Sequence, residues 1–157
     1  DMVVVPVGGG GLIAGMAAAI RKMSPDTLII GVEPEGANSL SRSFASGRPE
    51  TLESINTIAD SLGAPMALAE SMALARENVD ELITIPDSLM ADTMLLMSHT
   101  LNIVAEPACT ASLGSVLGPL RKRAAGKRVG VLACGSNIGS ERFEAYTSGA
   151  RMPMPPV

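Results

Sequence analysis

The hydrophobic positions of this chain fall into short β-branched runs that alternate with longer amphipathic segments. Short apolar runs are typical of strands buried in a parallel sheet, and apolar residues three or four positions apart are typical of helices. Strands are predicted over residues 2–7, 27–33, 81–85 and 127–135. Helices are predicted over residues 12–23, 37–46, 66–76, 89–101, 110–125 and 140–147. The alternation predicts the α/β fold class, a three-layer parallel β-sheet with helices on both faces.

The segments between these elements add three expectations. Residues 47–65 are polar without a clear period and predict a long loop, which in a compact domain is often functional. Asp87 and Ser88 are candidates to cap the helix that follows them. The chain opens almost inside a strand, which predicts a piece of a longer protein, and residues 148–157 predict a poorly ordered, proline-rich tail.

Composition narrows the class of protein and its partners. A chain of 157 residues can bury one core, which predicts a single domain before the tail. The net charge is −4, and the basic residues 121–123 and 127–128 lie at a predicted helix end, so we expect no nucleic-acid partner. No apolar run is long enough for a membrane span, so we expect no membrane partner. Two cysteines are too few for a disulfide framework, which favours a cytoplasmic location.

Four consecutive glycines, residues 8–11, separate the first predicted strand from the first predicted helix. A glycine loop at this point leaves bare backbone N–H groups beside the positive end of a helix dipole, an arrangement that suits a phosphate. The alternative is a tight, flexible connector, for which two glycines would be enough. The run therefore favours a phosphate site.

Two phosphate-containing cofactors fit this loop. Gly9, Gly11 and Ala14 match the G-x-G-x-x-A pattern of NAD-type dinucleotide binding, with Glu33 ending the next strand where a ribose-binding acid belongs. In a pyridoxal phosphate enzyme the loop holds one phosphate, and another strand end supplies a partner for the pyridine nitrogen. Cys134, at the end of the last predicted strand, is a candidate for that partner.

Five segments occur in the order "VPVGGGGLIAG", "GVEPEGANS", "TIADSLGAP", "VAEPACTAS" and "GVLACGSN". Together they resemble the fold-type II (tryptophan synthase beta-like) pyridoxal phosphate enzymes, most closely the threonine/serine dehydratases (ammonia-lyases), with serine racemase nearby. The resemblance runs from Val3 to about Phe143. It implies that residues 1–147 form the C-terminal part of the cofactor-binding catalytic domain.

The resemblance also implies roles for individual residues. Cys134 matches the position that faces the pyridine nitrogen, and Glu106 matches an acid near the cofactor ring. Ser61 follows Asp60 in a segment beside the active site, where the family often has glycine. From the residues alone, Cys134 could instead be a buried small side chain and Glu106 an acid at a helix start. The loop that holds the cofactor phosphate is matched by Gly8, Gly9, Gly10, Gly11 and Leu12.

A divalent metal is not expected. In the racemase-like branch two acids and a backbone carbonyl bind a cation, and the matching positions here are Glu33, Ala37 and Ser39. A serine hydroxyl is a poor replacement for a carboxylate at a hard cation.

The Schiff-base lysine of the family has no counterpart among Lys22, Lys122 and Lys127, so we expect it in an N-terminal half that precedes this sequence. No catalytic residue is therefore assigned within the chain. For the whole enzyme the resemblance implies a homodimer or higher oligomer that uses pyridoxal 5'-phosphate to dehydrate and deaminate L-threonine or L-serine to a 2-oxo acid and ammonia. The alternatives are a serine racemase-like enzyme or another fold-type II lyase, an NAD-type dinucleotide-binding module, and an inactive truncated product.

Overall fold

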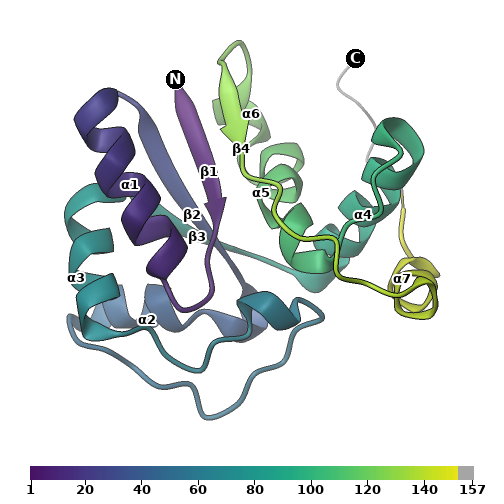
Figure 1. Ribbon diagram of the computed structural model, residues 1–157, viewed down its shortest axis with the longest axis horizontal. Helices are drawn as coiled ribbons and strands as arrows, with labels where there is room; N and C mark the ends of the chain where they lie inside the picture. Colours follow the sequence, from purple (N-terminus) through teal and green to yellow (C-terminus); the bar gives the residue numbers. More distant parts are fainter. Residues whose placement is uncertain (152–157) are drawn as a thin grey trace.

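A computed structural model of the protein describes residues 1–151, and all of the strands in it lie in one parallel sheet. The order across the sheet is β3-β2-β1-β4, so β1 pairs with both β2 and β4 (Figure 1). All three pairings are parallel, which confirms the predicted α/β class. The strands are β1 (Met2–Pro6), β2 (Leu28–Pro34), β3 (Glu81–Ile85) and β4 (Val129–Val131).

Helices cover both faces of the sheet (Figure 1). The first face carries α1 (Gly11–Met23), α2 (Ser39–Ser46) and α3 (Ala69–Asn78). The second face carries α4 (Asp87–Leu101) and α5 (Pro107–Leu117), followed by the short α6 (Arg121–Ala124). Beyond α4 lies α7 (Ser140–Thr147), and single turns of 3-10 helix occur as η1 (Glu35–Ala37) and η2 (Asp60–Leu62).

The core consists of two apolar layers, one on each face. On one face Val4 and Ile30 pack with Met90 of α4 and with Ala108 of α5, all at 2% exposure or less. On the other face strand and loop residues of β1 pack against α1 and α3. Each large side chain buried in this way contributes about 1.5–3 kcal/mol. The strands are continuous apolar runs in the sequence because helices cover both of their faces.

Two predicted elements in the C-terminal third of the chain have the wrong bounds for identifiable reasons. The helix predicted over 110–125 instead spans Pro107–Leu117, because proline suits the first turn and Gly118 and Pro119 end the helix. The strand predicted over 127–135 is regular only over Val129–Val131, and the chain then turns through Gly135, whose φ is +112°.

The predicted capping role of Asp87 or Ser88 is also wrong, because neither side chain caps α4. Pro86 occupies the cap position of α4, and the Asp87 carboxylate accepts hydrogen bonds from the Thr57 hydroxyl (2.6 Å) and the Ile58 N–H (2.8 Å). These bonds tie the long loop 47–65 to α4. At the end of that loop Met66 bridges to Thr51, so the next helix begins at Ala69 and not at residue 66.

The proline-rich part of the predicted tail, residues 152–157, lies outside the described residues. Within residues 1–151 no helix has both the length and the apolar character that a membrane crossing requires.

Candidate active site

The candidate site lies at the carboxyl ends of β1 and β4. These strands are parallel neighbours, so the segments that follow them meet at one edge of the sheet, where ligands of such sheets bind. After β1 the chain enters the glycine loop, residues 8–11. After β4 the Leu132 N–H donates to the Val4 carbonyl at 3.1 Å, which holds the segment leading to Cys134 beside β1.

The glycine loop leaves its backbone open at the start of α1. Gly10 adopts a φ of +83°, a conformation that favours glycine, and among the described residues no side chain caps the helix. A Cβ on Gly8 would lie 3.1 Å from the Leu62 Cα, so a side chain at this position would be tightly packed against η2. A Cβ on Gly11 would meet no described atom within 4 Å. Open N–H groups beside a helix N-terminus fit a phosphate.

A cavity of about 190 Å³, called here the cofactor cavity, opens at this loop. It brings together every residue assigned to the cofactor by sequence, from four separate segments of the chain. None of the three lysines, Lys22, Lys122 and Lys127, is among the described residues that line it. The lining residues assigned by sequence are Gly8, Gly9, Gly10, Gly11, Leu12, Ser61, Glu106 and Cys134.

Glu106 is held in this cavity by two neighbours. Its Oε1 accepts a hydrogen bond of 2.9 Å from the Ser61 hydroxyl, which comes from η2. A Cβ on Gly135 would lie 2.5 Å from the same oxygen, so the carboxylate packs directly on the glycine turn after Cys134. Glu106 stands at the start of α5, as the alternative interpretation expected, but its side chain does not cap that helix.

The two cysteines differ in environment. Cys134 is exposed, so the alternative interpretation of this residue as a buried side chain is wrong. Cys109 lies on α5 and is 4% exposed. Burial, together with the nearby Cys134 and Glu106, raises the pKa of the Cys109 thiol to about 11. Cys109 therefore packs as a neutral thiol, whereas Cys134 is open to the cofactor cavity.

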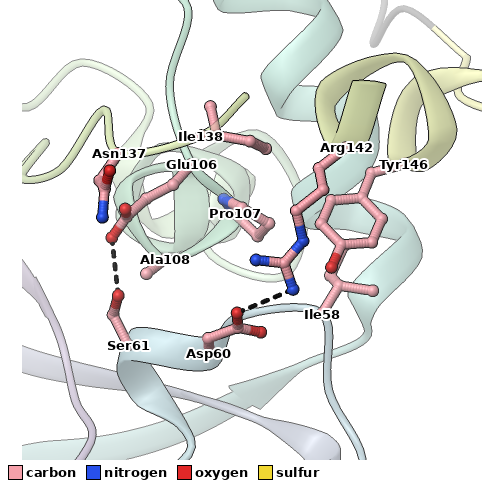
Figure 2. Close-up of a pocket in the computed structure, with 10 residues that line it drawn as sticks. All are labelled: Ile58, Asp60, Ser61, Glu106, Pro107, Ala108, Asn137, Ile138, Arg142 and Tyr146. Carbon is pink, nitrogen blue, oxygen red and sulfur yellow. Dashed lines mark hydrogen bonds and ion pairs between the residues drawn. The ribbon is translucent and has the colours of Figure 1, made fainter. Parts of the chain in front are cut away.

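A second cavity of about 150 Å³, called here the side cavity, adjoins the first and shares Ser61, Glu106 and Ala108 with it. Figure 2 shows Arg142 reaching from α7 toward Asp60, and the ion pair measures 3.0 Å. The hydrogen bond and the charge of Asp60 raise the pKa of the Arg142 guanidinium. The other lining residues are Ile58, Pro107, Asn137, Ile138 and Tyr146.

Sequence reasoning assigned no role to most of the side cavity. Arg142 and Tyr146 lie four residues apart on α7, which places them on one face of that helix. The guanidinium carbon of Arg142 lies 5.9 Å from the centre of the Tyr146 ring. The separation of four residues is the signal in the sequence that could have predicted this contact.

Glu33, Ala37 and Ser39, the positions matched to a metal site, lie apart from both cavities. Glu33 is fully buried, and its carboxylate accepts hydrogen bonds from the Leu40 N–H and the Ser41 N–H, each at 2.8 Å, and from the Ser41 hydroxyl. Burial raises the pKa of Glu33, and the hydrogen bonds from Ser41 and Leu40 oppose that shift.

The donor set around Glu33 does not fit a divalent cation or a ribose. The described residues include no group of three His, Cys, Asp or Glu side chains placed to hold a metal. Both Glu33 oxygens are engaged by the start of α2. This geometry speaks against the dinucleotide interpretation, which needs a free carboxylate at Glu33.

A protein-family model described as pyridoxal-phosphate dependent enzyme matches residues 1–135. Phenylserine dehydratase of Ralstonia pickettii is 44% identical over 146 residues, which cover 93% of this chain and 45% of that protein. L-threo-3-hydroxyaspartate ammonia-lyase of Saccharomyces cerevisiae is 36% identical over 150 residues, which cover 95% of this chain and 45% of that protein. The chain thus spans less than half the length of these relatives.

Solved structures show the same arrangement. The processed form of threonine deaminase isoform 2 from Solanum lycopersicum superposes with a TM-score of 0.89 at 25% identity, covering 94% of this chain and 43% of that one. Maize serine racemase superposes with a TM-score of 0.84 at 30% identity, covering 94% of this chain and 46% of that one.

Proposed function

The chain belongs to the family of pyridoxal-phosphate dependent enzymes, and from this membership we propose that the whole protein deaminates a 3-hydroxy amino acid. The hydroxyl group on C3 leaves as water, and hydrolysis of the resulting imine takes up one water and releases ammonia. The product is a 2-oxo acid. Threonine and serine are the substrates expected from the sequence resemblance, and dehydration is proposed as the main reaction over racemisation.

One observation carries this proposal. Four separate segments of the chain converge on one cavity at the carboxyl edge of the sheet, and they supply a glycine loop, a thiol, a carboxylate and a hydroxyl. The glycine loop has open N–H groups at the start of α1, and a Cβ on Gly8 would meet Leu62. These features fit the phosphate of pyridoxal 5'-phosphate, which needs bare backbone and no competing side chain.

The residues of the cavity have distinct proposed tasks. When bound, the cofactor supplies a ring that accepts electrons released at the substrate Cα. The N–H groups of residues 8–11 hold the phosphate, and Cys134 faces the ring nitrogen. A thiol is a weak donor, so Cys134 leaves that nitrogen largely unprotonated, which favours elimination. Ser61 orients Glu106 beside the ring.

Similar proteins support the substrate class but differ within it. The relative that is 44% identical is a phenylserine dehydratase, and the relative that is 36% identical acts on L-threo-3-hydroxyaspartate. The shared feature of these substrates and of threonine is a hydroxyl group on C3. We therefore propose a 3-hydroxy amino acid as substrate and place the lysine that carries the cofactor outside the present sequence.

The proposal is tested on the full-length protein purified with pyridoxal phosphate. We expect 2-oxo acid and ammonia from at least one 3-hydroxy amino acid, in equal amounts. Borohydride reduction followed by peptide mapping should locate the cofactor on a lysine outside residues 1–157. Attachment to Lys22, Lys122 or Lys127 would overturn the proposed division of the site, and racemisation without 2-oxo acid would overturn the proposed reaction.

A further inference from the structure

The side cavity opens directly beside the cofactor cavity. The two share Ser61, Glu106 and Ala108, so they are separated by only one layer of residues. A substrate held at the cofactor carries its C3 substituent two bonds from the reacting Cα. A substituent directed past the Ser61–Glu106 pair therefore enters the side cavity.

The size of the side cavity fits a ring. Its volume is about 150 Å³. An enclosed, wholly apolar protein cavity of about this volume binds benzene. The side cavity therefore has room for one ring, and five of its ten lining residues are apolar or aromatic. A methyl group would leave most of this space unfilled and would lose the dispersion contacts that a close-fitting group makes.

The lining offers surfaces on which an aromatic ring packs. Ile58, Pro107 and Ile138 present aliphatic side chains, and Tyr146 presents a ring from α7 (Figure 2). Arg142 adds the flat face of a guanidinium, a group that stacks on aromatic rings. Together these groups are suited to an aryl substituent.

The charges of the cavity disfavour a second carboxylate on the substrate. Asp60 and Glu106 bring two negative groups, and Arg142 is the one cationic side chain among the described lining residues. Arg142 is already paired with Asp60 at 3.0 Å. A substrate carboxylate would have to displace Asp60 and would then lie beside two like charges, which repel it.

We infer that the side cavity is the subsite for the C3 substituent of the substrate and that it selects an aryl group. This inference rests on the proposed function and makes Ile138 and Tyr146 determinants of specificity. It predicts that the enzyme prefers an aryl 3-hydroxy amino acid to one bearing a methyl or a carboxylate group.

The test compares three substrates on the full-length holoenzyme: L-threo-3-phenylserine, L-threonine and L-threo-3-hydroxyaspartate. We expect kcat/KM to be at least about tenfold higher for phenylserine than for the other two, a difference of about 1.4 kcal/mol. Ile138→Trp fills the side cavity and should lower the phenylserine-to-threonine ratio at least about tenfold. Glu144→Ala, on α7 but outside the cavity, is the matched control and should leave that ratio unchanged.

Binding of L-phenylalanine gives a second readout that needs no turnover, because this amino acid has no hydroxyl group on C3. Calorimetry should show binding to the parent protein, and Tyr146→Ala should weaken it without affecting the Glu144→Ala control. Equal changes for all substrates in Ile138→Trp, or phenylalanine affinity that both cavity variants retain, would overturn the inference while the proposed function stands. Failure of the parent protein to form 2-oxo acid from any of the three substrates would overturn the proposed function itself, and the inference with it.

Discussion

The Ser61 hydroxyl donates a hydrogen bond of 2.9 Å to Oε1 of Glu106, and this pair forms part of the wall between the cofactor cavity and the side cavity. The two residues are 45 positions apart in the sequence. Ser61 comes from the turn η2 and Glu106 from the start of α5, so the bond links two elements that pack at the site. Ser61 stands where the resembling family often has glycine, and a glycine could not make this bond.

Ser61→Ala should therefore loosen Glu106. One hydrogen bond to a carboxylate at an exposed site contributes about 1 kcal/mol, so the Kd for pyridoxal phosphate should rise by about threefold to tenfold. The measurement is a cofactor titration of the full-length apoprotein. Ser54→Ala, an exposed serine outside both cavities, is the control. Equal Kd values for the two variants would show that the bond does not position Glu106 for the cofactor.

Gly135 should tolerate no side chain. Its φ is +112°, and a Cβ would lie 2.5 Å from Oε1 of Glu106. Gly135→Ala should lower the free energy of unfolding by about 1–3 kcal/mol through backbone strain and should also weaken cofactor binding. Gly139→Ala is the matched control, because its φ is −77° and no described atom lies within 4 Å of the added Cβ. Urea unfolding measures the free energy of unfolding of both variants. Equal values for Gly135→Ala and Gly139→Ala would contradict the strain expected at Gly135.

The two cysteines should react with different rates. Cys109 has its pKa raised to about 11 by burial and by the nearby Cys134 and Glu106, so at about pH 8 almost none of it is the reactive thiolate. Cys134 is exposed and lines the cofactor cavity. Iodoacetamide should label Cys134 in the full-length apoprotein and leave Cys109 unlabelled, as peptide mass spectrometry would show. Bound pyridoxal phosphate should protect Cys134 from labelling. Equal labelling of Cys134 with and without the cofactor would contradict the place of Cys134 in the site.

The sequence predicted the parts of the fold that depend on local pattern. The strand Glu81–Ile85 and the helix Ser140–Thr147 have the predicted bounds, and the glycine run does precede a helix whose N-terminus is open. Four of the five ordered segments then predicted the residues that converge on the cofactor cavity. The helix predicted through Pro119 was wrong because proline breaks a helix even where the apolar pattern continues beyond it.

The side cavity could not be predicted in this way, because its walls come from long-range packing. Arg142 pairs with Asp60 across 82 positions of the sequence, and the backbone N–H of Ile58 donates a hydrogen bond to the carboxylate of Asp87 on α4. Exposed charged residues such as Arg142 carry no periodic signal for such a partner. Glu33 shows the converse: the sequence matched it to a ribose-binding acid or a metal ligand, but its carboxylate is bonded to the start of α2.

Glu33 should make the stability of the protein depend on pH in a defined direction. Its ordinary pKa is 4.5, and burial raises that pKa in the folded state against the opposing hydrogen bonds from Ser41 and Leu40. The folded protein thus holds the proton more tightly than the unfolded chain. The contribution of this group to the free energy of unfolding is fully present below its unfolded pKa and is lost as the pH rises through its folded pKa.

Glu33→Gln does not titrate, so it isolates this contribution. Glutamine loses hydrogen bonds from the Leu40 and Ser41 N–H groups, and this loss lowers the stability of the variant by the same amount at every pH. The contribution that proton binding to Glu33 makes to the stability of the parent changes with pH. The free energy of unfolding of the parent minus that of the variant should therefore decrease as the pH rises from about 4 toward neutrality. Urea unfolding of the full-length apoprotein at several pH values measures this difference, with Glu53→Gln at an exposed site as the control for general charge effects. A difference that grows with pH would mean that the hydrogen bonds at the start of α2 outweigh burial and lower the pKa of Glu33.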